Sequence, residues 1–183
     1  MASSTMNLRI DRGLRPPIFF TATLHLYRTP LICKQEHFPE GTLSHIVCVD
    51  EKGRKQGSYV GFYTTGDTAF VIDYTNDSID GYVWSCYKNG SKRYLARYSM
   101  NRIMEMIEFY DLNGNRLETG NMYNGNGTLR VYDQKGSIAL EGMIVNGFME
   151  GPWKVYGRTE EIFYVKEFVS GVDRSTNRRR LIF

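Results

Sequence analysis

The sequence has little cysteine, little proline, no strong excess of either charge and no long apolar run, and each shortage excludes a class of protein. Its three cysteines, Cys33, Cys48 and Cys86, are too few and too odd a set for a disulfide framework, so we predict reduced thiols in a cytoplasmic protein. A net charge of +3 is too small to predict nucleic acid as a specific partner. No apolar run reaches the roughly 18 residues that a membrane-spanning helix needs.

A signal peptide is not predicted either. The apolar stretch 17–26 is the nearest match to a signal core, but it begins with the second of two prolines, contains His25 and lacks a clear small-residue cleavage site. We therefore interpret this stretch as a buried strand.

Aromatic residues and glycine, in contrast, are abundant. The chain of 183 residues contains 13 Tyr, 10 Phe and 18 Gly but only 5 Pro. Tyrosine and phenylalanine favour strands and glycine favours tight turns, so the composition predicts many short strands joined by turns. The length suffices for one large domain or a repeat array with a real core.

Two turn signals recur along the chain. Tyrosines return at intervals of 22 to 24 residues, at Tyr63, Tyr87, Tyr110, Tyr132 and Tyr156. Glycines follow a few residues later, at Gly66, Gly90, Gly114 and Gly136. A second signal falls midway, at Asn76-Asp77, Asn124-Gly125, Asn146-Gly147 and Ser170-Gly171. Because such pairs tolerate the positive φ angles of hairpin turns, we predict one β-hairpin per repeat.

The strand before each tyrosine has one apolar face. The residues one and three positions before the five tyrosines are all apolar or cysteine, namely Val60, Phe62, Trp84, Cys86, Ile107, Phe109, Leu129, Val131, Trp153 and Val155. Side chains alternate along a strand, so these ten are predicted to share one buried face, with Trp84 and Trp153 both buried. The returning strands also alternate, although Leu117 and Thr119 form a weak pair.

The same alternation places the repeat tyrosines opposite the apolar rows, and this position has two interpretations. In the first, each tyrosine packs across neighbouring strands and shields the backbone. In the second, Tyr87, Tyr110 and Tyr132 form a partly exposed binding platform together with Glu108 and Arg130.

The stretch "GTLRVYDQKGSIALEGMIVNGFMEGPWKVY" resembles the MORN-variant repeat, whose units read roughly Gly-x-Trp-x-x-Tyr, a glycine turn, a short strand and Asn-Gly. The resemblance covers residues 57–171 and is strongest between Tyr110 and Tyr156. Bacterial proteins of this type are classed with the YwqK-type antitoxin components, which are thought to be immunity partners of secreted toxins. The resemblance implies a hairpin-meander fold and a binding role, and it carries over no catalytic residue.

Together these patterns predict an all-β fold, an antiparallel meander of about five β-hairpins of 22–24 residues each that forms a long twisted or rolled sheet with an N-terminal β cap. The predicted organisation is a flexible N-terminus (1–15), the cap (16–56), the hairpin repeats (57–171) and a basic C-terminal tail (172–183). The tail contains Arg174, Arg178, Arg179 and Arg180. It is interpreted as a solvated, partly disordered segment or, alternatively, as a docking segment for an anionic partner.

Two pairs of cysteine and histidine residues are candidates for a zinc site. Cys33, His37, His45 and Cys48 are the candidate ligands, but His45 and Cys48 stand three apart in a predicted strand and would face opposite ways. No metal and no other cofactor is therefore predicted.

The sequence thus predicts a non-catalytic binding module, most concretely an immunity or antitoxin-like protein whose partner is another protein, for example a toxin. One alternative is a membrane-associated scaffold in which the basic tail and exposed aromatic residues contact anionic lipid. Another is an enzyme whose site is formed by the cap and loops. No nucleophile elbow, phosphate loop or zinc-protease helix supports the enzyme. The sequence does not predict the oligomeric state.

Overall fold

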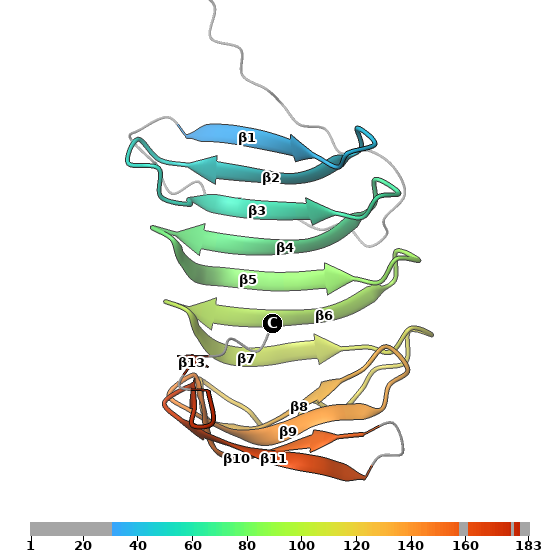
Figure 1. Cartoon of the computed structure of the whole chain (residues 1–183), viewed down its shortest axis with the longest axis vertical. Coiled ribbons are helices and arrows are strands. Elements are labelled where there is room, and N and C mark those ends of the chain that lie inside the picture. Colours follow the sequence, from blue (N-terminus) through green and yellow to red (C-terminus); the bar gives the residue numbers. More distant parts are fainter. Residues whose placement is uncertain (1–30, 158–160, 177, 180–183) are drawn as a thin grey trace, which may run out of the picture.

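The computed structural model describes residues 31–157, 161–176 and 178–179. Within these ranges every regular element is a β-strand, and the strands form two antiparallel sheets (Figure 1). The predicted all-β class and the hairpin meander are therefore confirmed.

The first sheet contains seven strands that lie side by side in the order of the sequence. They are β1 (Ile32–His37), β2 (Leu43–Val49), β3 (Gly57–Phe62), β4 (Thr68–Thr75), β5 (Ser78–Cys86), β6 (Lys92–Ser99) and β7 (Arg102–Phe109). This sheet occupies the upper two thirds of the view in Figure 1.

The second sheet contains six strands and lies at the lower end of the molecule (Figure 1). Its members are β8 (Gly127–Tyr132), β9 (Ile138–Val145), β10 (Phe148–Tyr156), β11 (Ile162–Val169), β12 (Val172–Asp173) and β13 (Arg178–Arg179). They also follow the sequence order, so β8 and β13 are the outermost strands of this sheet.

The predicted long sheet is divided into two, because the meander is interrupted between β7 and β8. The segment 110–126 forms only two isolated bridges, Tyr110 with Arg116 and Tyr123 with Asn126. The interruption includes the pair Leu117/Thr119, whose apolar pattern was the weakest of the returning strands. This segment is also rich in residues with positive φ, at Gly114, Gly120, Asn124 and Gly125. Four positive-φ residues within twelve positions favour turns over an extended strand, and the second sheet begins after them.

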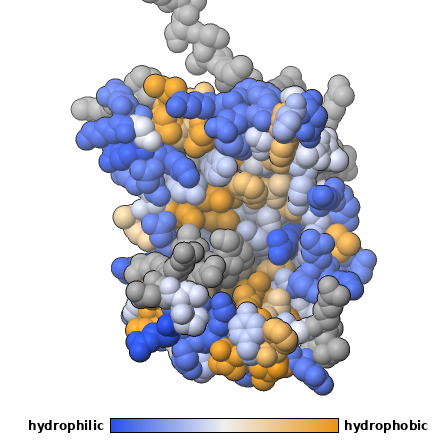
Figure 2. Space-filling model, viewed as in Figure 1, coloured by the Kyte–Doolittle hydropathy of each residue, from blue (hydrophilic) through white to orange (hydrophobic). Residues whose placement is uncertain are grey.

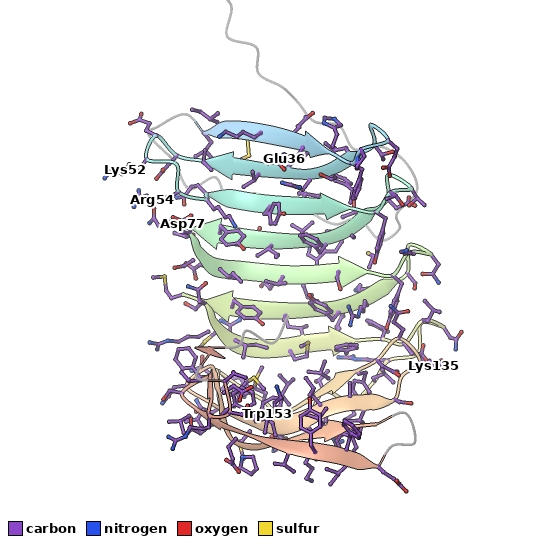
Figure 3. The ribbon with its side chains drawn as sticks, in the orientation of Figure 1. Glu36, Lys52, Arg54, Asp77, Lys135 and Trp153 are labelled. Atoms are coloured by element: carbon purple, nitrogen blue, oxygen red, sulfur yellow. A yellow bond between two sulfur atoms is a disulfide. The ribbon has the colours of Figure 1, made fainter. Side chains whose placement is uncertain are left out.

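The core is formed by residues of both sheets. It combines Ile103 and Phe109 of β7 with Leu129 of β8, Ile144 of β9 and Trp153 of β10, all of which are at most 1% exposed. Figure 3 labels the indole of Trp153 at the lower end of the molecule. Its ring lies against the backbone of Gly142, where an added Cβ would stand 2.3 Å from the ring. The glycine is therefore required for close packing of this tryptophan.

The prediction that Trp84 and Trp153 share one buried face is wrong for Trp84. Trp84 is only half-buried, whereas its neighbour Val83 is 2% exposed and belongs to the core. The turn hydrogen bonds explain the difference. Tyr87 has the same position in its turn as Asp133 has in the later hairpin, and Tyr132 stands one residue before that position. Tyr87 N–H donates to the carbonyl of Ser91, and Asp133 N–H donates to that of Ser137.

The first two tyrosines of the series are therefore displaced by one position relative to the last three. A shift of one residue moves every side chain of a strand to the other face, so Val83 corresponds to Leu129 and Trp84 to Arg130. The spacing between tyrosine and glycine indicates the same shift of one position in the sequence, since Gly90 follows Tyr87 by three positions and Gly136 follows Tyr132 by four.

The midway turns have the predicted geometry. Both central residues have positive φ in Asn76-Asp77, Asn124-Gly125, Asn146-Gly147 and Ser170-Gly171, as two-residue hairpin turns of type I′ require. A fifth turn of this kind, at Met100-Asn101, was not predicted. Its φ angles are 48° and 65°. Methionine is unusual at the first position of such a turn, so Asn101 was the residue of the pair that indicated a turn in the sequence.

These turns hydrogen-bond to one another along one side of the molecule. The N–H of the second turn residue donates to a carbonyl of the preceding hairpin in each case: Asp77 to Lys55, Asn101 to Ile79, Gly125 to Met104, Gly147 to Gly125, and Gly171 to Met149, at 2.8–3.1 Å. The series continues across the break between β7 and β8. It therefore joins the two sheets at this side.

Candidate functional site

The three tyrosines of the predicted platform are largely occupied in packing. Tyr87 and Tyr132 are 3% and 7% exposed, and Tyr110 is half-buried. The hydroxyl of Tyr87 donates a hydrogen bond of 2.9 Å to the carbonyl of Tyr110 in the next hairpin. The hydroxyl of Tyr132 donates to the carbonyl of Glu118. Burial raises the pKa of both phenols, so they remain neutral donors.

The exposure that a platform needs is therefore absent at Tyr87 and Tyr132. The same contact occurs in the first hairpin, where Tyr63 donates to the carbonyl of Cys86 at 2.7 Å. These hydroxyls connect neighbouring hairpins, as the packing interpretation expected.

The two charged residues predicted beside the tyrosines are each paired within the chain. Lys92 Nζ lies 2.7 Å from Glu108 and 5.6 Å from the centre of the Tyr110 ring. Arg130 Nε lies 2.7 Å from Glu141. That hydrogen bond raises the pKa of Arg130 and lowers the pKa of Glu141.

Arg130 also belongs to a larger ion-pair network over the outer face of the second sheet. Its Nη1 lies 3.0 Å from Glu118, and Lys154 Nζ lies 3.3 Å from Glu141. An open hollow of about 380 Å³ lies beside this network and is lined by 116–120. The network neutralises its own charges, so it offers little unpaired charge to a ligand.

The structure pairs Cys33 with Cys48 in a disulfide, which corrects the prediction of reduced thiols. The two residues are direct neighbours across the β1–β2 ladder, and Figure 3 shows the bond between these strands. The number of cysteines does not show which of them a hairpin places opposite each other. With this correction, the prediction of a cytoplasmic location loses its main support. Cys86 is free and buried.

The two histidines considered as zinc ligands lie farther along the same β1–β2 hairpin. Nε2 of His45 is 3.4 Å from Glu36, and its ring meets the edge of Tyr59, while His37 pairs with Leu43 at the end of the ladder. Within the described ranges no group of three or more His, Cys, Asp or Glu side chains is placed to hold a metal ion. No helix long and apolar enough to cross a membrane occurs in this part of the chain.

The described residues of the predicted tail include two short strands. Val172–Asp173 pairs with β11, and Arg178–Arg179 pairs with β12. Asp173 is fully buried, accepts a hydrogen bond from the Ser175 hydroxyl at 2.6 Å and lies 3.1 Å from Lys166 Nζ. The hydroxyl and then the ammonium group hold the pKa of Asp173 well below its usual value. Arg174 is exposed, and Arg180 lies outside the described residues, as do the predicted flexible N-terminus (1–15) and the strand at 17–26.

In the described part of the chain, four consecutive apolar residues of β11 are exposed. Ile162, Phe163, Tyr164 and Val165 are 52%, 76%, 43% and 51% exposed. Figure 2 shows apolar residues gathered at the lower end of the molecule, where Figure 1 places β10 and β11. Phe163 and Val165 alternate like an inward-facing pair, but Val165 pairs with Lys154, on the face opposite Trp153.

One backbone edge of β11 is open beside this cluster. β10 pairs with β11 from Ile162 to Phe168, but β12 pairs only with Phe168 and Val169. Among the described residues, the stretch 162–166 therefore has a ladder partner on one side only. An exposed apolar strand with an open edge can accept another strand.

β1, at the opposite end, also has an open edge, but this edge is polar. Its six residues are Ile-Cys-Lys-Gln-Glu-His, and all six are exposed. Charged residues on an edge strand discourage pairing with another chain. Of the two ends, only the β11 end combines an open edge with apolar side chains.

Comparison with known proteins adds no relative. No family model, no curated protein and no solved structure matches this chain.

Proposed function

We propose that this protein is a non-catalytic binding module and that it recognises another protein through β11. The observation that carries the proposal is the cluster Ile162–Val165, where four consecutive large apolar side chains are exposed. Exposed apolar patches of this kind mark interaction surfaces in soluble proteins. Phe163 and Tyr164 supply large rigid rings, which are the side chains that most often anchor protein interfaces.

The open edge beside these side chains suggests how a partner would bind. An extended segment of the partner would add to the second sheet along 162–166, where it would hydrogen-bond to the unpaired side of the strand. Its apolar side chains would pack on Phe163 and Val165. Strand addition uses backbone hydrogen bonds for affinity and side-chain contacts for specificity, and β11 offers both.

The resemblance to the MORN-variant repeat supports a binding role and suggests a toxin as the partner class. The recurring turn contacts and the Tyr63 and Tyr87 hydroxyl contacts are consistent with a hairpin repeat. The tyrosines hold the hairpins together, so in this proposal they position the binding strand and do not contact the partner.

A photo-crosslinking residue at position 163 tests the proposal in the native host. It should trap one protein, whose affinity is then measured with both proteins purified. We expect Phe163→Asp to weaken binding by about 2 kcal/mol or more, or about 30-fold, because it places a charge in an apolar interface.

Tyr82→Asp is the matched control, since Tyr82 is an aromatic residue of the first sheet and is also exposed, at 49%. It should leave affinity within about threefold. Unchanged affinity of a folded Phe163→Asp protein would refute the proposed surface. Salt-sensitive pelleting of the purified protein with anionic vesicles, without any crosslinked protein, would favour the membrane-scaffold alternative instead.

A further inference from the structure

The β1 strand, at the opposite end of the molecule from β11, is attached with unusually little burial. All six of its residues are exposed, and in the described part of the chain it pairs only with β2. Its single large apolar residue, Ile32, is 57% exposed. Because stabilisation follows the apolar area removed from water, side-chain packing contributes little to holding β1 in place.

The Cys33–Cys48 disulfide supplies the covalent attachment that packing does not. It joins directly opposite residues of β1 and β2 that are 15 positions apart in the sequence. A cross-link at this place keeps the ladder partners together when their hydrogen bonds open, so the strand recloses instead of leaving the sheet.

The neighbouring strand, β2, is more apolar and more buried than β1. β2 reads Leu-Ser-His-Ile-Val-Cys-Val and is half-buried along its whole length, and it pairs with β3 only through His45 and Ile46. Removal of β1 would leave β2 as the outermost strand, with an apolar sequence and an open edge. β1, with Lys34 and Glu36, therefore covers an edge that would otherwise accept another strand.

We propose that the Cys33–Cys48 disulfide is a redox-sensitive clip, and that its reduction by a dithiol releases β1 and uncovers the edge of β2. This inference does not rest on the proposed function, because it concerns the other end of the molecule. Cys33 is exposed and Cys48 is half-buried, so the attacking thiolate reaches the sulfur of Cys33.

The reaction proceeds in two exchanges. In the first, the reductant forms a mixed disulfide with Cys33, and Cys48 leaves as a thiolate that takes up a proton. In the second, the other thiol of the reductant displaces Cys33, which also takes up a proton. The protein disulfide gains two electrons and two protons, and the dithiol becomes a cyclic disulfide. Cys86 takes no part, because it is buried and burial raises its pKa.

Hydrogen exchange of the full chain, followed by mass spectrometry with and without dithiothreitol, tests the clip. We expect reduction to accelerate exchange in 32–37 and 43–49 by about tenfold or more, and to leave β6 and β10 unchanged. The double variant Cys33→Ser/Cys48→Ser should show the same fast exchange without reductant. Cys86→Ser is the control and should respond to dithiothreitol as the unmodified chain does.

Three results would overturn the proposal. The first is unchanged exchange in both strands after thiol titration has shown that the disulfide is open. The second is exchange that accelerates equally in both sheets, which would make the disulfide a staple of the whole fold. The third is a count of three free thiols after refolding in an oxidising glutathione buffer.

Discussion

Trp153 gives the sharpest test of the core, because the chain contains only one other tryptophan and the two have different environments. Trp153 is 0% exposed, its ring centre lies 6.3 Å from that of Phe168, and its Nε1 donates to the carbonyl of Met143 at 3.1 Å. Replacement by alanine empties an aromatic site and also leaves a carbonyl without its donor. We expect Trp153→Ala to lower the free energy of unfolding by about 3–5 kcal/mol.

The assay is urea unfolding of the oxidised protein, followed by circular dichroism. With a denaturant slope of about 2–3 kcal/mol per molar urea, this loss lowers the midpoint by about 1–2.5 M. Trp84→Ala is the matched control, since Trp84 lies half-buried on the opposite face of its sheet. It should cost clearly less, about 1–2 kcal/mol.

If Trp153→Ala does not fold, the phenylalanine variants provide a second measurement. Trp84→Phe leaves Trp153 as the only indole, and its fluorescence should be blue-shifted and poorly quenched by acrylamide. Trp153→Phe leaves Trp84, whose emission should be red-shifted and readily quenched. Equal midpoints for the two alanine variants, or reversed quenching in the phenylalanine variants, would show that the assignment of faces is wrong.

Three further predictions test the packing, the inter-hairpin contacts and the buried carboxylate. Gly142→Ala should destabilise the fold by about 1–3 kcal/mol, because its Cβ would stand 2.3 Å from the Trp153 ring, whereas Gly157→Ala, with nothing nearer than 3.8 Å, should be nearly neutral in the same urea assay. Tyr132→Phe should cost about 1 kcal/mol by removing the hydroxyl that bonds Glu118, and an unchanged midpoint would contradict that role. Because the pKa of Asp173 is lowered in the folded state, its carboxylate stabilises the fold above 3.8, the ordinary value, and this contribution is lost as the pH falls below it. The difference in Tm between the unmodified chain and Asp173→Asn should therefore shrink as the pH is lowered from 6 toward 2.

Local turn chemistry made the hairpins predictable from the sequence. Asn124-Gly125 and Asn146-Gly147 adopt positive φ at both positions because few other pairs do so at low cost. The turn therefore fixes where each strand ends, and alternation fixes which of its residues share a face. Both rules act over a few residues, so no knowledge of the remaining chain is needed.

The predictions from the sequence failed where a distant contact or a shift of one residue determined the structure. Trp84 was assigned to the wrong face because tyrosine was taken as the fixed point of the repeat, whereas the turn hydrogen bonds place Tyr87 with Asp133. At 110–126 the local signals were the weak pair Leu117/Thr119 and the glycines at 114 and 120, which do not by themselves show that a second sheet begins. The disulfide required the register of β1 on β2, which brings Cys33 opposite Cys48.

The candidate surface was missed for a related reason. Phe163 and Val165 alternate as Tyr94 and Ala96 do, and β6 buries the latter pair. The turn hydrogen bonds, however, align Gly157 with Tyr87, so the residues of β11 that correspond to Tyr94 and Ala96 are Tyr164 and Lys166. Val165 pairs with Lys154, on the face opposite Trp153. A sequence pattern records which residues of a strand share a face, and the register decides whether that face is turned toward the core. Phe163 and Val165 are therefore exposed because the register turns them away from Trp153, and this is the surface that we propose binds a partner.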